Sequence, residues 1–294
     1  MDLIVIIIYN DFKGQFCMKN NFSVFYEHIS EAAEQNNSTV AKMLEYAVNC
    51  GIDGLECDLW RLDDKANVRT LFDSCGVKVS TIYNFFDFPH EDRNTCEMKY
   101  RKLLETAAYF GTDKVLCVPG FVNAGEQMSE SRKIVAERLN EMCTAAKEYG
   151  VTVTLEDFDD EKSPCCTTEG LLYFMRNVND LRYTFDTGNF RYCLENADEA
   201  YSVLKDYVVH VHLKDRSYDS ANADMNNTNG KADLSGAVMY PSIVCEGVIG
   251  IDKLIGKLVA DGYSGRFAIE HFGAVNQAEY MKKSAENIRK VLAK

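Results

Sequence analysis

The sequence is poor in several features, and each absence excludes a class of protein. Only four prolines occur among 294 residues and 26% of the residues are charged, so the composition fits neither a disordered nor a fibrous chain. Lysine and arginine form no run or stripe, and the formal net charge is −13. Because binding to a phosphate backbone depends on clustered basic side chains, we expect no nucleic-acid partner.

No uninterrupted apolar stretch of about 20 residues, the length that spans a bilayer, occurs in the sequence. The apolar run at residues 3–8 is too short, and it lacks the basic start and small-residue cleavage site of a secretory signal. Residues 1–21 could hold a strand or form an N-terminal extension ahead of a second start at Met18. We therefore expect no membrane association.

The eleven cysteines follow no repeating spacing, and no CxxC pair is present. Their number is odd and their surroundings are apolar, as for Cys117 between Leu116 and Val118. This usage is typical of reduced thiols packed in a core, and it predicts a cytoplasmic protein.

Short β-branched runs alternate with longer amphipathic segments along the chain. Helices are expected at residues 38–49, up to about 75, and at 97–110, 129–149, 168–177, 197–204, 251–261 and 277–292. Strands are expected at residues 22–26, 54–57, 77–83, 114–118, 151–155, 181–185, 208–213 and 266–269. Eight strand–helix units without a break in composition predict a single α/β domain over residues 1–294, a (β/α)8 TIM barrel. No GxGxxG motif follows the first strand, which disfavours a dinucleotide-binding fold. The long connection at residues 214–250 is expected to be functional, as lids are.

Ionisable residues follow four successive expected strands at their carboxyl ends, where the active site of such a barrel lies. They are Glu156, Asp186, His212 and Glu270. Three carboxylates and one imidazole that converge would require a cation, and this donor set suits Mn²⁺, Mg²⁺ or Co²⁺ better than Zn²⁺. His210 points to the same face as His212 but lies deeper, so we expect it in a lower, hydrogen-bonded layer.

Each of these residues alone has a simpler explanation. A carboxylate after a strand is often a helix cap, Asp186 before Thr187 and Gly188 could form an Asx-turn, and His212 could be a core histidine. The occurrence on four consecutive strands favours the metal site.

Other residues near the strand ends are candidates for the pocket. Lys214 could meet a substrate oxygen or phosphate, or it could be a solvated loop lysine. Glu56 closes the second strand, and Trp60 could stack on a sugar face or pack against the barrel rim.

Several stretches resemble the xylose-isomerase-like barrel superfamily, and within it the sugar phosphate isomerase/epimerase group that includes ketose 3-epimerases. The resemblance spans residues 22–294. The matching stretches are GIDGLE at 51–56, TLE at 154–156, FDTGN at 185–189, VHVHLKD at 209–215 and GYSG at 262–265 leading into AIE at 268–270.

The resemblance implies that Glu156, Asp186, His212 and Glu270 bind one divalent metal ion, Mn²⁺ first and Mg²⁺, Co²⁺ or Zn²⁺ as alternatives. It also implies that Glu156 and Glu270 exchange the substrate proton, while the metal stabilises a cis-enediolate. The expected partner is a sugar, a sugar phosphate or a cyclitol, and such barrels are commonly homodimers or homotetramers.

The chain departs from the epimerases around this site. Their histidine three residues after the aspartate is Asn189 here, and their acidic residue six after the first glutamate is Lys162. Their arginine six residues after the metal-binding histidine is replaced by Tyr218, with Arg216 close by. We expect Asn189, Lys214, Arg216, Glu56 and Trp60 to contact the substrate, whose identity stays open.

Three alternatives accompany the isomerase or epimerase hypothesis. A metal-dependent dehydratase of the cyclitol or dehydroshikimate type would use the same site but expel water. An apurinic endonuclease would need a histidine-rich trinuclear zinc site and a basic face, which five histidines and a charge of −13 disfavour. A non-catalytic sugar-binding barrel would not need the four metal-binding residues.

Overall fold

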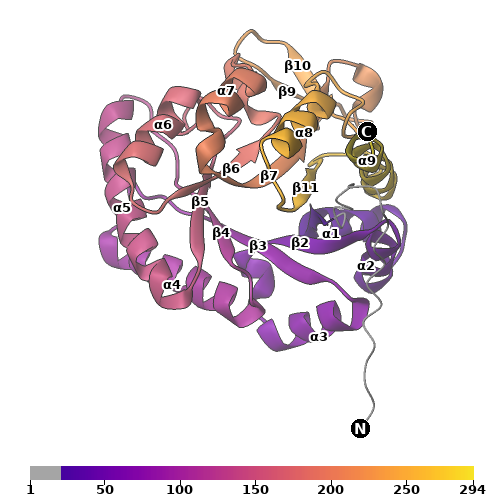
Figure 1. Cartoon of the computed structure of the whole chain (residues 1–294), viewed down its shortest axis with the longest axis horizontal. Coiled ribbons are helices and arrows are strands. Elements are labelled where there is room, and N and C mark those ends of the chain that lie inside the picture. Colours follow the sequence, from indigo (N-terminus) through magenta and orange to yellow (C-terminus); the bar gives the residue numbers. More distant parts are fainter. Residues whose placement is uncertain (1–20) are drawn as a thin grey trace.

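Eight parallel strands close into a barrel that is ringed by helices (Figure 1). The structure is a computed structural model that describes residues 21–294. Around the barrel the strand order is β1, β11, β7, β6, β5, β4, β3 and β2. These strands are β1 (Phe22–Phe25), β2 (Ile52–Asp58), β3 (Lys78–Phe85), β4 (Lys114–Val118), β5 (Thr152–Glu156), β6 (Arg182–Asp186), β7 (Val208–Lys214) and β11 (Phe267–Glu270). The predicted (β/α)8 TIM barrel is therefore confirmed.

The helices follow the strands in the expected alternation, and most bounds lie within a few residues of the prediction. They are α1 (Tyr26–Gln35), α2 (Val40–Asn49), α3 (Lys65–Cys75), α4 (Arg93–Phe110), α5 (Met128–Tyr149), α6 (Thr168–Asn177), α7 (Ala197–Leu204), α8 (Ile251–Ala260) and α9 (Gln277–Leu292). Helices α4 and α5 end at Gly111 (φ 73°) and Gly150 (φ 66°), whose left-handed conformation favours glycine.

Helix α1 was not predicted. It begins directly after β1, and its buried face is formed by His28, Ile29, Ala32 and Ala33. The two alanines and the histidine contribute little to a hydrophobic pattern, although they follow the i, i+3, i+4 spacing of a helix. The weak pattern explains why sequence periodicity alone does not reveal this helix.

The main hydrophobic core lies between the strands and the surrounding helices, while the barrel interior is polar. Val153 and Leu155 of β5 belong to the same buried cluster as Leu139 of α5 and Leu171 of α6. Side chains alternate along a strand, so Thr154 of β5 faces the interior. There its Oγ1 accepts a hydrogen bond from Thr184 of β6 at 2.8 Å. The barrel thus buries hydroxyl, carboxyl and imidazole groups along its axis.

The segment 215–250, which we call the insertion, holds a small antiparallel sheet and not a structureless loop. Its strands are β8 (Arg216–Ser217), β9 (Lys231–Ala232) and β10 (Val238–Pro241), in the order β8, β10, β9. The carboxylate of Asp215 anchors the returning chain, since it accepts hydrogen bonds from the backbone N–H groups of Cys245 (2.9 Å) and Gly247 (3.0 Å). Figure 1 shows β9 and β10 at one side of the barrel, near β7.

Two expectations concern parts of the chain outside this framework. The expectation for residues 1–21 lies almost wholly outside the described residues, since residues 1–20 are not described. Among residues 21–294, no helix combines the length and the apolar character needed to cross a membrane.

Candidate active site

Four ionisable side chains meet at the carboxyl ends of four neighbouring strands. Glu156 ends β5, Asp186 ends β6, His212 lies near the end of β7 and Glu270 ends β11. One nitrogen or oxygen atom of each residue lies within 4.8 Å of those of the other three, and all four side chains are buried. We call these residues the quartet. Their meeting follows from strand order, because β5, β6, β7 and β11 are consecutive in the barrel.

Hydrogen bonds fix the quartet but leave a buried carboxylate oxygen without a partner among the described residues. The Nδ1 atom of His212 lies 2.7 Å from Oε1 of Glu156 and 3.3 Å from Oε2 of Glu270. The Oδ1 atom of Asp186 accepts hydrogen bonds from the backbone N–H groups of Gly188 (2.6 Å) and Asn189 (2.8 Å). Its other oxygen, Oδ2, is buried and has no hydrogen-bond partner among the described residues.

A second carboxylate holds Asp186 from behind. The Oδ1 atom of Asp157 accepts hydrogen bonds from the phenol of Tyr183 (2.5 Å) and from the backbone N–H of Asp186 (3.1 Å). Packing also requires glycine at position 188, two residues after the end of β6. A Cβ atom at Gly188 would lie 2.5 Å from the backbone oxygen of Lys214, so only glycine lets β6 and β7 end side by side.

The electrostatics of the quartet are those of a cation site. Burial raises the pKa of Asp186 well above its usual value, and the charges of Glu270 and Glu156 raise it further. Burial also raises the pKa of Glu156, although the imidazole of His212 works in the opposite direction. Three oxygen donors and one nitrogen donor, with a free and buried carboxylate oxygen, fit a divalent ion. The buried cluster can therefore hold a metal ion.

A polar layer lies beneath the quartet and contains Glu56 and His210. The Oε1 atom of Glu56 lies 2.9 Å from Nε2 of His210 and accepts hydrogen bonds from Ser23 (2.8 Å) and Ser80 (2.9 Å). Its Oε2 atom lies 3.6 Å from Nε2 of His212. Burial alone would raise the pKa of Glu56, but the two histidines hold it well below its usual value. Glu56 is therefore ionised directly under the imidazole of His212.

The structure does not place Glu56, a predicted substrate contact, in the wall of the cavity above the quartet. Glu56 is fully buried and is not among the residues that line the cavity above the quartet. The reason is its position as the fifth of seven residues in β2, which places it below the rim. His210 lies in the lower, hydrogen-bonded layer where it was expected.

A cavity of 320 Å³ opens above the quartet at the carboxyl end of the barrel. One part of its wall is apolar and another is polar. The apolar part consists of Phe25, Tyr83, Phe85, Leu116, Val118, Phe158 and Phe272. The polar part consists of Glu156, Asp159, Asn189, Lys214, Arg216 and Glu270. The volume is that of a pocket for a small molecule.

Three of the predicted substrate contacts, Asn189, Lys214 and Arg216, lie in this wall. Lys214 is not a solvated loop residue, because it is buried and its Nζ lies 2.9 Å from Oε1 of Glu270. The same ammonium group donates a hydrogen bond to Oδ1 of Asn189 at 2.7 Å. Lys214 thus connects the quartet to the polar wall.

The structure does not place Trp60, another predicted substrate contact, in the wall of the cavity. Its side chain is 61% exposed and is not among the residues that line the cavity. Asp58 caps the short 3-10 helix η1 (Leu59–Leu62), which carries Trp60 to the surface, where the guanidinium carbon of Arg61 lies 4.5 Å from the ring centroid.

Sequence reasoning missed Asp159 as a member of the polar wall. Its carboxylate lies 3.4 Å from Nζ of Lys214 and 2.7 Å from Nζ of Lys231 on β9. The acidic stretch at residues 156–161 gave a signal, but a run of acidic residues is more typical of a solvated loop. The fold of the β5–α6 loop and the insertion brings these residues together.

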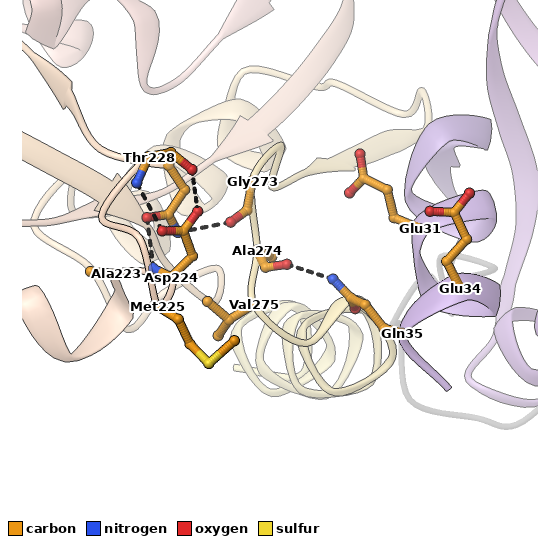
Figure 2. A pocket seen from close by; sticks show the side chains of 11 residues that line it. Glu31, Glu34, Gln35, Ala223, Asp224, Met225, Thr228, Gly273, Ala274 and Val275 are labelled. Carbon is orange, nitrogen blue, oxygen red and sulfur yellow. Dashed lines mark hydrogen bonds between the residues drawn. The ribbon is translucent and has the colours of Figure 1, made fainter. Parts of the chain in front are cut away.

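A larger cavity of 630 Å³ lies away from this chemistry (Figure 2). It is formed by α1, the insertion and the segment after β11, and Figure 2 shows Gln35 donating a hydrogen bond to the backbone oxygen of Ala274 (3.0 Å). No quartet residue lines it, and its ionisable lining residues, Glu31, Glu34 and Asp224, are all acidic. The smaller cavity is therefore the candidate active site.

The chain belongs to the xylose isomerase-like TIM barrel family, whose model matches residues 44–291. No curated protein matches the sequence. Among solved structures, a probable 3-DHS dehydratase of Bacillus anthracis is similar at a TM-score of 0.71 and 16% identity, covering 92% of this chain and 98% of that chain. A D-psicose 3-epimerase of Clostridium cellulolyticum gives a TM-score of 0.69 at 15% identity, covering 92% and 99%.

A xylose isomerase-like TIM barrel protein of Mycobacterium smegmatis, in complex with magnesium, gives a TM-score of 0.67 at 19% identity, covering 92% of this chain and 96% of that chain. At these identities the likeness establishes the fold. The family includes sugar epimerases, and a dehydratase is among the structural neighbours.

Proposed function

We propose that this protein is a divalent-metal-dependent isomerase or epimerase of a sugar or sugar phosphate. The observation that carries the proposal is the buried quartet at the base of a cavity of small-molecule size, where Oδ2 of Asp186 has no partner among residues 21–294. Glu156, Asp186, His212 and Glu270 would hold the ion. The bound ion would polarise a substrate carbonyl and the adjacent hydroxyl, and Mn²⁺ is our first expectation for it.

The positions of the two glutamates support a role for both in proton transfer. Glu156 on β5 and Glu270 on β11 stand at the two ends of the four-strand arc that carries the quartet, with β6 and β7 between them. Both line the cavity. One carboxylate can remove a proton from a substrate carbon on one face, and the other can return a proton on the opposite face.

Other residues of this chain would orient the substrate. The ammonium group of Lys214 lies 2.9 Å from Glu270, so it can donate to a substrate oxygen beside the reacting carbon. Asn189 is fixed by a hydrogen bond from its amide to the backbone oxygen of Asp157 (2.7 Å). Phe25 and Phe272 pack edge to face with ring centroids 5.0 Å apart and restrict access of water from the apolar side.

Deuterium exchange tests this proposal. The Mn²⁺-loaded protein is incubated in D2O with ketoses, aldoses, sugar phosphates and cyclitols, and mass spectrometry locates deuterium on a carbon. We expect Glu156→Gln and Glu270→Gln to reduce exchange by about 10²–10⁴-fold, the usual contribution of a general acid or base. Glu169→Gln, an exposed residue of α6, is the matched control.

Metal content must be measured for each variant, because both glutamates are proposed ligands. Exchange is therefore compared at saturating Mn²⁺, and only variants that bind the ion are interpreted. Retained exchange in both glutamine variants would rule out the acid–base roles of Glu156 and Glu270.

A dehydratase is the second candidate, favoured by the ammonium group of Lys214 beside the quartet, which could assist a departing hydroxyl group. It would share the proton abstraction but would release water. The same incubations separate the two reactions, because a dehydratase gives a product lighter by the 18 mass units of water, while an isomerase or epimerase changes the mass only by the deuterium that it incorporates.

A further inference from the structure

Arg216 carries a charge that the described residues do not neutralise. Its side chain is 5% exposed and lines the cavity above the quartet. Its Nε atom is buried and has no hydrogen-bond partner, and among residues 21–294 no carboxylate oxygen lies within 4.0 Å of the guanidinium group. Arginine stays protonated in proteins, and a buried charge without a counter-ion is strongly unfavourable. The guanidinium group of Arg216 is therefore available to pair with an anionic ligand in the cavity.

The carboxylates near Arg216 are engaged elsewhere. Asp159 is shared by Lys214 (3.4 Å) and Lys231 (2.7 Å). Asp215, the preceding residue, uses Oδ1 and Oδ2 to accept hydrogen bonds from backbone N–H groups, including that of Arg216 itself (2.9 Å). Glu270 is occupied by Lys214 and His212. Among residues 21–294, none of these three carboxylates forms an ion pair with the guanidinium group.

An aromatic ring compensates only part of this charge. The guanidinium carbon of Arg216 lies 5.8 Å from the ring centroid of Tyr192, and Nζ of Lys231 lies 5.2 Å from the same centroid. Two cations therefore share one ring. Lys214 and Lys231 share the carboxylate of Asp159, and Lys214 also pairs with Glu270, so these two carboxylates are balanced by the lysines and not by Arg216.

The backbone fixes the position of Arg216. It lies on β8, where it pairs with Pro241 of β10, and its carbonyl oxygen accepts a hydrogen bond from Val248 (2.8 Å). The backbone of Arg216 is therefore held on a short, ordered strand. A guanidinium fork matches the two oxygens of a carboxylate or phosphate, whereas one neutral hydroxyl would leave its charge unbalanced.

We infer that Arg216 binds an oxyanion of the substrate, a carboxylate or a phosphate, so that the substrate class is an anionic hydroxy-ketone or hydroxy-aldehyde and not a neutral sugar. The identity of the reacting part of this substrate rests on the proposed function. The binding of the oxyanion depends only on the contacts of Arg216. The apolar wall, with Phe25, Tyr83 and Phe158, lies against the less polar face of the same molecule.

Direct binding tests the oxyanion site without turnover. Inorganic phosphate and, separately, glycolate are titrated by calorimetry into the Mg²⁺-loaded protein, which distinguishes phosphate from carboxylate as the source. We expect at least one of them to bind, and Arg216→Gln to weaken that binding at least tenfold, while Arg216→Lys, which keeps the charge, restores part of it. Arg191→Gln is the matched control, because Arg191 is outside the cavity and its guanidinium donates to Tyr218 (2.9 Å).

The comparison of the wild type with Arg216→Gln also separates anion binding by the metal from anion binding by the arginine. Anion binding that is equal in the wild type and in a folded Arg216→Gln variant would overturn the inference, because the metal alone would then hold the anion. The absence of any anion binding by the wild type would overturn it as well.

The exchange assay gives an independent outcome. Matched pairs, such as D-fructose and D-fructose 6-phosphate or D-fructose and the corresponding uronic acid, are compared in D2O. We expect the anionic member to react with the lower KM, and Arg216→Gln to raise its KM at least tenfold with kcat within about threefold. Exchange with neutral sugars alone would overturn the inference and leave the proposed function intact. If no compound exchanges deuterium, the proposed function fails, while the calorimetric titrations still decide the role of Arg216.

Discussion

Replacement of Glu56 by glutamine is expected to weaken metal binding while the barrel stays folded. Glu56 does not reach the cavity, but its Oε2 atom lies 3.6 Å from Nε2 of His212, on the side of the ring opposite the quartet. A carboxylate at this place favours the tautomer with hydrogen on Nε2, which leaves the lone pair of Nδ1 for the ion. An NH2 group there would favour the opposite tautomer, in which Nδ1 carries the hydrogen.

The expected magnitude follows from this geometry. Removal of a carboxylate that orients a metal-binding histidine typically weakens affinity by about 10–100-fold, or about 1.4–2.7 kcal/mol. The fold should tolerate the change, because the amide oxygen of glutamine can still accept the hydrogen bonds from Ser23 (2.8 Å) and Ser80 (2.9 Å). The variant therefore separates the metal site from the stability of the barrel.

Calorimetric titration with Mn²⁺ at neutral pH measures the effect, and circular dichroism checks the fold of each variant. Glu31→Gln on α1 is the matched control, because this glutamate bonds to Gln277 at the outside of the barrel. An affinity within twofold of the wild type in a folded Glu56→Gln protein would refute the orienting role of Glu56.

Two further predictions follow from the quartet and its surroundings. Gly188→Ala would place a Cβ 2.5 Å from the backbone oxygen of Lys214, so we expect the free energy of unfolding, measured by urea denaturation, to fall by about 1–3 kcal/mol. The control is Gly256→Ala in α8, where the new Cβ meets open space and should stabilise the protein by about 1 kcal/mol. Equal effects of the two substitutions would contradict the packing argument. Because burial and the charges of Glu270 and Glu156 raise the pKa of Asp186 well above its usual value, the metal-free protein holds a proton that the ion must displace, so metal affinity should fall as the pH is lowered. The raised pKa of Asp186 stabilises the metal-free fold at low pH, and this contribution is lost as the pH rises through the raised pKa. The stabilisation of the fold by the metal should therefore grow with pH. Identical heats of metal binding in buffers of different ionisation enthalpy would show that no proton is released and would contradict this prediction.

The fold and the quartet were accessible from the sequence for one physical reason. Parallel strands place their carboxyl ends at the same edge of a barrel, so residues that directly follow neighbouring strands must converge. Glu156, Asp186 and Glu270 are the last residues of their strands, and His212 lies two residues before the end of β7. Only the order of the strands was needed to bring them together.

Two predicted substrate contacts, Glu56 and Trp60, lie outside the cavity wall, and their positions depend on where a strand ends. Strand β2 continues to Asp58, one residue beyond the predicted end, and this places Glu56 below the rim. The turn that Asp58 caps then carries Trp60 outward. Such local geometry depends on hydrogen bonds of single residues, which a hydrophobic pattern does not reveal.

The sequence by itself determined the barrel, because the alternation of apolar strands and amphipathic helices admits few other architectures, and it determined the four residues at the strand ends. Only the tertiary structure decided how the polar wall is neutralised. Asp159, Lys231 and Arg216 are separated by long stretches of chain, and whether a charge finds a counter-ion depends on distances of a few ångström between loops. The single charge that finds none, among the cavity-lining residues, is that of Arg216.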